Sequence, residues 1–448
     1  MPYRFLINEN GVPFGSSELA SQRSILESYD DNVRIEYRNQ NAQAIAEHEA
    51  EKLLIVSGPG TGKSYLFLNR IKHWFCRDAN SKVLTTSFVR KLVADLQNDI
   101  QNDSNLSDTQ KKNISVFTLH KFARSIVEQN RGTSEWQFEP HFHIISQVWK
   151  AVVWKDVLDF YPTYNASQYT WEKFEDQLHN NLFDQAEEWR QLRNKYFQLC
   201  RFFNATGFAD LILRAKDALI ETPTIVDYNS LIIDEYQDFN PAEKELILKL
   251  AAYSRGIVIV GDDDQVLYEK LKSSKPQLIR ELYNDPNFVN SMLPFCSRCS
   301  SFITKTAEYF ISQSREQTSI DKIYLPIHSD DNNPKVQVIA CATPQTAVSY
   351  VEKFISDHRN FIEERKTQLE AGEESDPFLL ILSPTKDVKF YGKSRNTLYK
   401  ISSGYKAENR SFSDDYYKIL NYYSLSNYPQ NNFTFRKVGS SHKSVGNF

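Results

Sequence analysis

The stretch KLLIVSGPGTGKS, residues Lys52–Ser64, decides how this chain can fold. Its first half is a short apolar run with β-branched members, typical of a buried strand, and its second half is a glycine-rich turn. The segment SYLFLNRIKHWF that begins at Ser64 has the pattern of a helix. A strand, a glycine-rich turn and a helix in this order predict a loop whose backbone N–H groups close around phosphate oxygens.

The predicted phosphate loop contains the residues Ser57, Gly58, Pro59, Gly60, Thr61, Gly62, Lys63 and Ser64. Lys63 can reach the β- and γ-phosphates of a nucleotide, and the Ser64 hydroxyl can ligate Mg²⁺. Ser57 stands where such loops usually begin with glycine, a departure that leaves three glycines and the GKS end intact. A glycine-rich turn with a purely structural role is the alternative, and the strand–loop–helix context argues against it.

Three more apolar runs predict buried strands of the same sheet. They are KVLTTSF at Lys82–Phe88, NSLIIDE at Asn229–Glu235 and RGIVIVGD at Arg255–Asp262. Buried strands that alternate with helical segments indicate a parallel sheet covered by helices. We therefore expect an α/β fold of the P-loop NTPase class.

Two acidic motifs come at the ends of these strands. DEYQD, Asp234–Asp238, resembles a Walker B segment, in which Asp234 would hold Mg²⁺ and Glu235 would orient the attacking water as a general base. An ordinary solvated loop is the alternative for these acids. GDDDQ, Gly261–Gln265, places three consecutive acids that repel one another unless a metal or cationic partners compensate. Gln265 can report the γ-phosphate by hydrogen bonding without adding charge.

Composition places the chain among globular proteins. At about 150 residues per domain, 448 residues correspond to roughly three domains. Apolar residues make up 41% and charged residues 25%, which suffices for a sizeable core. The 53 Lys and Arg against 57 Asp and Glu give a net charge of −4 and no global positive field. This argues against a tail-driven nucleic-acid binder and leaves a local basic groove open.

Cysteine usage and hydropathy indicate the compartment. Five cysteines are too few and too scattered for a disulfide framework. The beginning of the sequence, MPYRFLINENGVPFG, has no basic region followed by a long apolar run, so no secretory signal is visible. No run approaches the ~18 consecutive apolar residues of a membrane span. We expect a reduced, cytoplasmic protein with no membrane partner.

Two further regions have their own character. Ala123 to about Thr206 reads helical and contains five of the six tryptophans, which predicts an inserted helical subdomain with tryptophans in its core. After Pro294 a second α/β unit is predicted. Its elements are KVQVIACA as a strand, QTAVSYVEKFISDH as a helix and FLLILSP as a strand.

In their order and spacing, the three strand-end motifs resemble those of the superfamily 1 DNA helicases of the UvrD/Rep/PcrA type. TTSFVRKLVADL, Thr85–Leu96, resembles motif Ia of that family and puts Phe88 at the position that contacts a base. FTLHKF, Phe117–Phe122, resembles motif Ib, with Thr118 and His120 at family positions. The resemblance thus implies that these three residues bind DNA.

The resemblance also implies residues for the rest of the nucleotide site. RNQNAQAI, Arg38–Ile45, lies where the family carries its adenine-reading glutamine; Gln43 fits the spacing slightly better, and Gln40 remains the alternative. CSRCS lies where motif IV places an arginine, so Arg298 is the candidate γ-phosphate contact from the second motor domain. The lone CxxC around Arg298 has no second pair at zinc spacing, and packing of both cysteines around the arginine is favoured over zinc.

Two departures from the family pattern stand out. In YEKLKS, Tyr268–Ser273, Lys270 and Leu271 replace the family's Trp and Arg. Lys270 would contact a DNA phosphate, or be an ordinary surface lysine. The family's motifs V and VI do not occur before Phe448, and the last stretch resembles the opening of a helical insertion. We expect either a truncated product or a shortened relative that needs a protein partner to complete its ATP site.

The resemblance implies a RecA-like fold with the following plan. The expected parts are an N-terminal extension at 1–35, an ATP-binding domain at 36–125 and 206–285, a helical insertion at 126–205, a partial second RecA-like domain at 286–410, and the start of a second helical insertion at 411–448. The expected function is an ATP- and Mg²⁺-dependent helicase or translocase. It would act 3′ to 5′ on single-stranded DNA and couple hydrolysis to strand separation in DNA repair or phage defence. An ATP-gated DNA- or partner-binding subunit with weak hydrolysis is the alternative.

Overall fold

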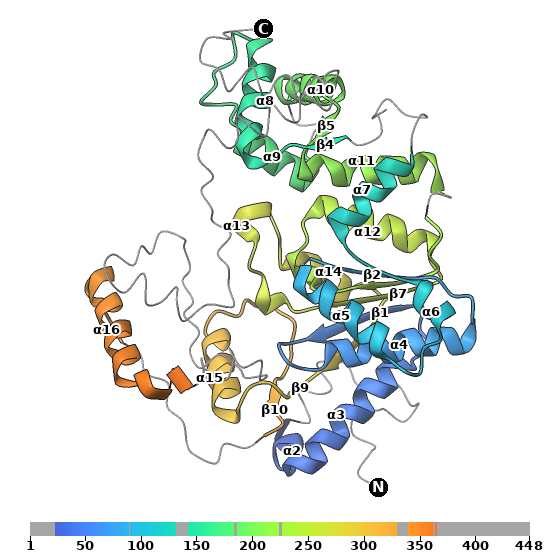
Figure 1. Cartoon of the computed structure of the whole chain (residues 1–448), viewed down its shortest axis with the longest axis vertical. Helices are drawn as coiled ribbons and strands as arrows, with labels where there is room; N and C mark the ends of the chain where they lie inside the picture. The colour runs from blue at the N-terminus through green and yellow to red at the C-terminus, as the bar shows by residue number, and fades with distance from the viewer. Residues whose placement is uncertain are drawn as a thin grey trace. The chain divides into compact units, whose positions relative to one another are not determined.

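The computed structural model describes residues 23–88, 90–130, 142–182, 186–223, 226–328, 339–361 and 363–364 (Figure 1). The chain forms two compact units, whose described residues lie within 23–328 and within 339–364. Each unit is described by itself. None of the helices described in either unit is long and apolar enough to cross a membrane.

A six-stranded sheet forms the centre of the first unit. Its strands are β1 (Lys52–Ser57), β2 (Val83–Ser87), β3 (Ile114–Thr118), β6 (Ser230–Ile233), β7 (Gly256–Gly261) and β8 (Val289–Leu293). They lie in the order β3-β2-β6-β7-β1-β8, and every pairing is parallel. The parallel α/β sheet predicted from the apolar runs is confirmed. All carboxyl ends therefore meet at one edge, where ligands of such sheets bind.

Apolar side chains on both faces explain why the strands are apolar throughout. Leu53 and Ile55 belong to one core cluster, whereas Leu54 and Val56 belong to another, as alternate residues of a strand must. The helices that flank the sheet are α3 (Asp31–Ala46), α4 (Lys63–Arg77), α5 (Arg90–Asn102), α6 (Asp108–Lys112), α7 (Leu119–Gln129), α11 (Phe208–Glu221), α12 (Pro241–Tyr253) and α14 (Gln277–Tyr283). Side chains of α3, α4 and α5 cover one face, and side chains of α7, α11, α12 and α14 cover the other.

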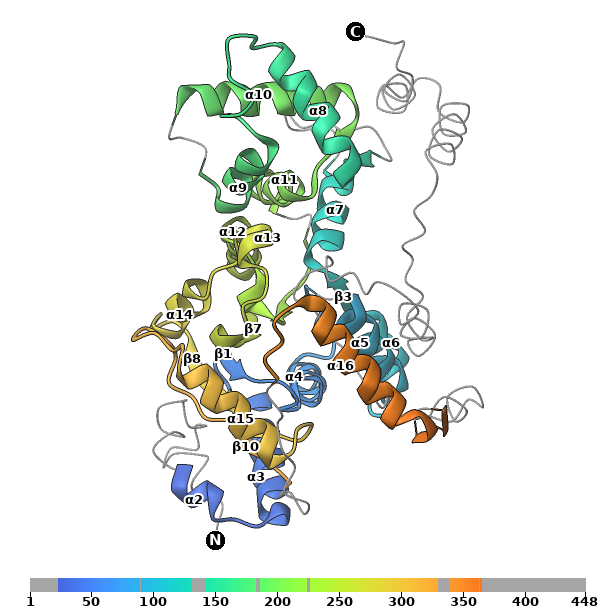
Figure 2. The ribbon, with the colours of Figure 1, turned by 90° about the vertical axis from the view of Figure 1, so that its left-hand side faces the viewer.

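A helical insertion separates α7 from α11. It consists of β4 (His143–Ile144), α8 (Gln147–Asp159), α9 (Trp171–Asn180), α10 (Glu187–Phe202) and β5 (Ala205–Thr206). Figure 2 shows α8 and α10 beyond α11, on the side away from the sheet, with α9 beside α11. Trp154 and Trp171 are buried in its core, and Trp154 stacks on Phe174 with ring centroids 4.6 Å apart. The core role predicted for these two tryptophans is confirmed, and Trp136 lies outside the described residues.

The first residues described belong to the compact unit. Helix α2 (Arg23–Glu27) buries Leu26 completely, and α3 begins at Asp31, where the Asp30 side chain accepts a hydrogen bond from Val33 N. Arg34 donates to the carbonyl of Pro326 at 3.0 Å. The expectation of a polar extension through residue 35 is therefore corrected at its end, because a helix cap and a buried leucine fix this segment in place.

Past β8, the chain forms β9 (Phe295–Cys296), α15 (Ser301–Ser312) and β10 (Leu325–Pro326), with β9 and β10 paired in parallel. Because β8 pairs with β1, a boundary that follows the sheet lies after residue 293 rather than after residue 285. In the second unit, α16 (Pro344–Asp357) confirms the predicted helix. Of the strand predicted at 335–342, only 339–342 are described, and they form no strand; the strand at 378–384 and the segment 411–448 lie outside the described residues.

Candidate nucleotide-binding site

The glycine-rich turn between β1 and α4 has the backbone of a phosphate loop. Gly60 and Gly62 have φ angles of +70° and +92°, which side chains with a Cβ rarely adopt. Gly62 is the N-cap of α4 and supplies no side-chain hydrogen bond to its first turn. Backbone N–H groups at such a helix start, together with the helix dipole, favour an anion.

Ser57, the departure from the usual loop sequence, has a structural role. Its Oγ lies 2.6 Å from Thr61 Oγ1, which in turn donates to the Gly58 carbonyl at 3.0 Å. Ser57 and Thr61 are both buried. The serine hydroxyl thus closes the loop from inside, which explains why the loop tolerates it at this position.

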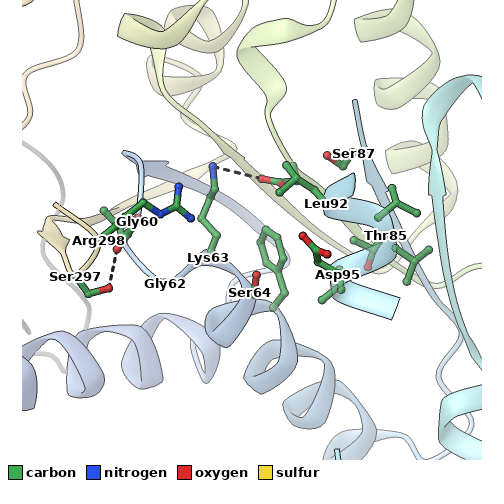
Figure 3. A pocket seen from close by; sticks show the side chains of 16 residues that line it. Gly60, Gly62, Lys63, Ser64, Thr85, Ser87, Leu92, Asp95, Ser297 and Arg298 are labelled. Atoms are coloured by element: carbon green, nitrogen blue, oxygen red, sulfur yellow. Dashed lines mark hydrogen bonds and ion pairs between the residues drawn. The ribbon is translucent and has the colours of Figure 1, made fainter. Parts of the chain in front are cut away.

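The loop borders a pocket of about 310 Å³ at the carboxyl edge of the sheet. Figure 3 shows Lys63, Ser64 and Arg298 around it, with Thr85 and Ser87 of β2 on another side. Asp234, at the end of β6, also lines the pocket. The structure therefore brings together the phosphate loop, one of the predicted metal ligands of the acidic motif and the arginine from beyond β9.

Lys63 forms an ion pair with the acids of DEYQD. Its Nζ lies 2.5 Å from Glu235 Oε1 and 3.9 Å from Asp234 Oδ1. Burial lowers the pKa of Lys63, but Asp234 and Glu235 outweigh that effect and hold it above its ordinary value. Burial raises the pKa of Asp234 to about 7, against the opposing charge of Lys63. Lys63 neutralises this acidic strand end at the place where a phosphate group would lie.

Glu235, the predicted general base, has a left-handed backbone with a φ of 53°. Such a conformation costs free energy in a residue with a Cβ, and strained residues of this kind cluster at functional sites. Gln237 Nε2 donates to Glu235 Oε2 at 2.7 Å, while Gln237 Oε1 accepts from Asp262 N at 3.1 Å. Gln237, which the sequence analysis did not single out, thus connects the two acidic motifs.

The acids of GDDDQ are compensated by buried cations. Lys322 Nζ lies 2.5 Å from Asp262 Oδ1 and 3.1 Å from Asp264 Oδ2, and it also pairs with Asp263. Arg280 Nε lies 2.8 Å from Asp263 Oδ2. We predicted that either a metal or cationic partners must compensate these charges, and cationic partners do so.

Arg298 is placed by contacts of its neighbour with the phosphate loop. Ser297 donates to the Gly60 carbonyl from its N–H at 2.9 Å and from its hydroxyl at 3.0 Å. A Cβ on Gly60 would lie 2.5 Å from Arg298 Cβ and 3.3 Å from Cys296 Sγ, so only glycine fits there. Cys296 therefore packs against the loop itself, and Cys299 donates its N–H to the Cys296 sulfur at 3.4 Å.

The two candidate adenine contacts lie elsewhere. Gln43 donates to Glu47, the C-cap residue of α3, and Gln40 donates to Glu36 at 3.4 Å within the helix. Within the described part of the chain, neither glutamine lines the pocket. Both assignments remain predictions.

Three of the four predicted DNA contacts have partners within the protein. Phe88 packs on Tyr268 with ring centroids 4.7 Å apart, and Lys272 Nζ lies 3.7 Å from the centroid of its ring. Thr118 caps α7 by accepting from Lys121 N at 3.3 Å. His120 Nδ1 lies 3.7 Å from Glu243 Oε1. Lys270 lies in α13 (Glu269–Lys272), and its side chain is outside what is described.

A parallel sheet with a glycine loop after β1 and acids at the ends of β6 and β7 defines the chain as a P-loop NTPase. Within that class, the model of the UvrD/REP helicase N-terminal domain matches residues 38–287, and the chain belongs to this family.

Curated relatives agree with this family at low identity. A putative ATP-dependent DNA helicase, YjcD, of Bacillus subtilis is 22% identical over 343 residues, which cover 71% of this chain and 44% of the relative. The ATP-dependent DNA helicase PcrA of Leuconostoc citreum is 24% identical over 422 residues, or 89% of this chain and 54% of the relative. DNA helicase II of Escherichia coli is 24% identical over 255 residues, or 52% and 34%. The chain spans roughly a third to a half of these relatives' lengths.

Proposed function

We propose that the chain is the ATP-binding part of a UvrD-type motor, which binds Mg–ATP in the pocket beside the phosphate loop and couples its hydrolysis to movement along single-stranded DNA. Family membership and the relatives named as ATP-dependent DNA helicases support this proposal. The observation that supports it most is the ion pair between Lys63 and Glu235 at the uncapped start of α4. A phosphate group can take the place of the carboxylate there without any new cation.

The residues divide the work as follows. Lys63 and the backbone of Ser57–Ser64 bind the β- and γ-phosphates, and Arg298 approaches the γ-phosphate from the other side. Once a phosphate holds Lys63, Glu235 is released to accept a proton from the attacking water. Gln265 reports the presence of the γ-phosphate.

Magnesium fits the donors on this side of the pocket. Ser64 presents a hydroxyl and Asp234 a carboxylate to the same space, and such hard oxygen ligands suit Mg²⁺. The ion would neutralise charge on the phosphates, while Gln43 or Gln40 would contact the adenine. These assignments belong to the proposal.

Nucleic acid would lie along Phe88, Thr118, His120 and Lys270, with translocation 3′ to 5′ and strand separation in repair or defence as the role. A second candidate is an ATP-gated binding subunit with slow hydrolysis. The favouring observation is that, in the described lining of the pocket, Arg298 is the one cation beyond the phosphate loop. A protein partner that donates an arginine would then complete the site.

Glu235→Gln tests the proposal because the amide is nearly isosteric and cannot take a proton. We expect unchanged affinity for Mg–ATP and a loss of about 10²–10⁴-fold in single-strand-stimulated hydrolysis. The matched control is Glu172→Gln, on the exposed side of α9, which should leave both unchanged.

Three outcomes separate the possibilities. Hydrolysis by Glu235→Gln at the wild-type rate contradicts the assigned base, and absence of ATP binding by the wild-type chain contradicts the proposal. Slow hydrolysis by the wild-type chain, with ATP tightening its DNA complex, favours the second candidate.

A further inference from the structure

The segment that follows α15 returns to the end of β7 and is anchored on its acids. We call this segment, Arg315–Tyr324, the strap. Arg315 Nη2 lies 3.4 Å from Asp264 Oδ2, and Ile320 N donates to Asp263 Oδ2 at 3.2 Å. The strap continues into β10, where Leu325 N donates to the Pro294 carbonyl at 2.7 Å.

Lys322 is the strap's main contact with the acids. Its side chain has no solvent exposure, and its ammonium pairs with all three carboxylates of GDDDQ. A buried ammonium surrounded by three acids is held in one place, because moving it would leave several charges buried without a counter-charge. Lys322 therefore fixes the geometry of this strand end.

Tyr324 connects the same acids to the phosphate loop. Its hydroxyl donates to Asp262 Oδ2, and its ring lies so close to Gly58 that a Cβ there would be 2.4 Å from Tyr324 Cε1. The side chain is 8% exposed. One rigid ring thus touches both the loop that would hold the phosphates and the carboxylate beside the predicted γ-phosphate sensor.

Asp262 transmits these contacts to Gln265. Its Oδ2 accepts from both Tyr324 and the Gln265 amide, while its Oδ1 accepts from Lys322 and from Asp264 N at 3.1 Å. With both oxygens occupied, the carboxylate cannot rotate freely, so the direction in which Gln265 presents its amide is set by the strap.

We propose that Lys322 and Tyr324 are positioning residues of the nucleotide site: they hold Asp262, and through it the Gln265 amide, in the arrangement by which the site tells a nucleoside triphosphate from a diphosphate. The inference rests on the proposed nucleotide site and adds the residues that set its selectivity. It concerns a segment outside the matched family domain, residues 38–287.

Tyr324→Phe is the sharpest test because it removes one hydroxyl and keeps the ring against Gly58. Calorimetric titrations in Mg²⁺ would compare ADP with a non-hydrolysable ATP analogue. Loss of one hydrogen bond predicts about three- to tenfold weaker binding of the triphosphate analogue, with ADP changed by less than about twofold. Tyr309→Phe, at an exposed tyrosine of α15, makes the same chemical change elsewhere and should alter neither.

A double-mutant cycle with Gln265→Ala tests the route. If Tyr324 acts through Gln265, the hydroxyl has no further effect once the amide is gone. Equal losses for both nucleotides, or additive effects of the two changes, overturn the inference while leaving the nucleotide site intact. If the wild-type chain binds neither nucleotide, the proposed function fails and the inference fails with it.

Discussion

Two acidic strand ends lie side by side in the sheet and differ in how their charge is balanced. At the end of β6, Asp234 and Glu235 face Lys63, whose side chain is 17% exposed and lines the pocket. At the end of β7, the three acids of GDDDQ face Lys322, whose side chain is fully buried. The sequences of the two motifs look equally suited to bind a metal.

The difference shows that the place of the counter-ion, rather than the number of acids, decides what an acidic motif can do. Lys63 reaches solvent through the pocket, so a phosphate can compete with Glu235 for its ammonium. Lys322 has no such access, and removing its charge would leave carboxylates buried without a partner. We infer that the ion pair at the end of β6 can exchange its carboxylate for a phosphate group. The ion pairs at the end of β7 stay formed.

The largest expected effect comes from Lys322→Met. Removing one partner of a buried ion pair typically costs about 3–5 kcal/mol, and here three carboxylates lose their shared cation. Urea unfolding should show this loss in the free energy of unfolding, with the same dependence on denaturant. A loss below about 1 kcal/mol, as is usual for exposed pairs, would remove the distinction between the two strand ends.

Lys63→Met should have the opposite profile. We expect binding of the triphosphate to weaken by about 10²-fold, the worth of charged hydrogen bonds to phosphate, and the free energy of unfolding to change little. Titration calorimetry and urea unfolding on the same preparation measure both quantities. Unaltered ATP affinity would contradict the assignment of the pocket. A large loss of stability would show that the ion pair of Lys63, like those of Lys322, stabilises the fold.

The sequence was sufficient to predict four of the six strands because each of these carries its own signal, whereas β3 and β8 were not predicted. The runs around Leu54, Ile232 and Val258 are apolar on both faces, as parallel strands covered by helices require, whereas the run around Leu84 continues into buried threonines. The glycines at positive φ can also be identified from the sequence, since few other residues adopt the backbone angles of this turn. These features are local, so no knowledge of distant contacts was needed.

The counter-ions could not be predicted in this way. Lys322 follows GDDDQ by more than fifty residues and lies in the unremarkable segment IDKIYLP. Nothing local distinguishes it from a surface lysine; only the return of the strap to the sheet does. Gln237 could have been noticed in the sequence, because it is a glutamine inside an acidic strand-end motif.

A third lysine, Lys272, is intermediate in exposure between Lys63 and Lys322. Lys272 Nζ pairs with buried Glu243 at 2.9 Å and covers Phe88, and its side chain is 12% exposed. If a base stacks on Phe88 when DNA binds, Phe88→Ala should weaken single-strand binding by about 1–3 kcal/mol. Fluorescence titration with an oligonucleotide and thermal unfolding should be measured together. Lowered stability with unchanged DNA affinity would show that Phe88 has a packing role and binds no base. The ion pair of Lys272, like those of Lys322, would then stay formed when DNA binds.

The smallest expected effect concerns His120, which shares Glu243 with Lys272. Burial lowers the pKa of His120 from 6.5, against the opposing charge of Glu243, so the unfolded chain binds its proton more readily than the folded one. The folded state therefore loses stability from this group as the pH falls below 6.5, and no such loss occurs above it. His120→Gln cannot titrate, so the free energy of unfolding of the variant should gain on the wild type between pH 7 and 5.

The lowered pKa of His120 also predicts how this residue acts toward DNA. With its pKa lowered, His120 is neutral at pH 7.5 and releases no counter-ion from a phosphate. His120→Gln should therefore leave the slope of log affinity against log salt unchanged at that pH. A slope reduced by about one would mean that His120 carries a charge against the DNA backbone. That result would mean that the ion pair of Glu243, like that of Lys63, changes partner when a ligand binds.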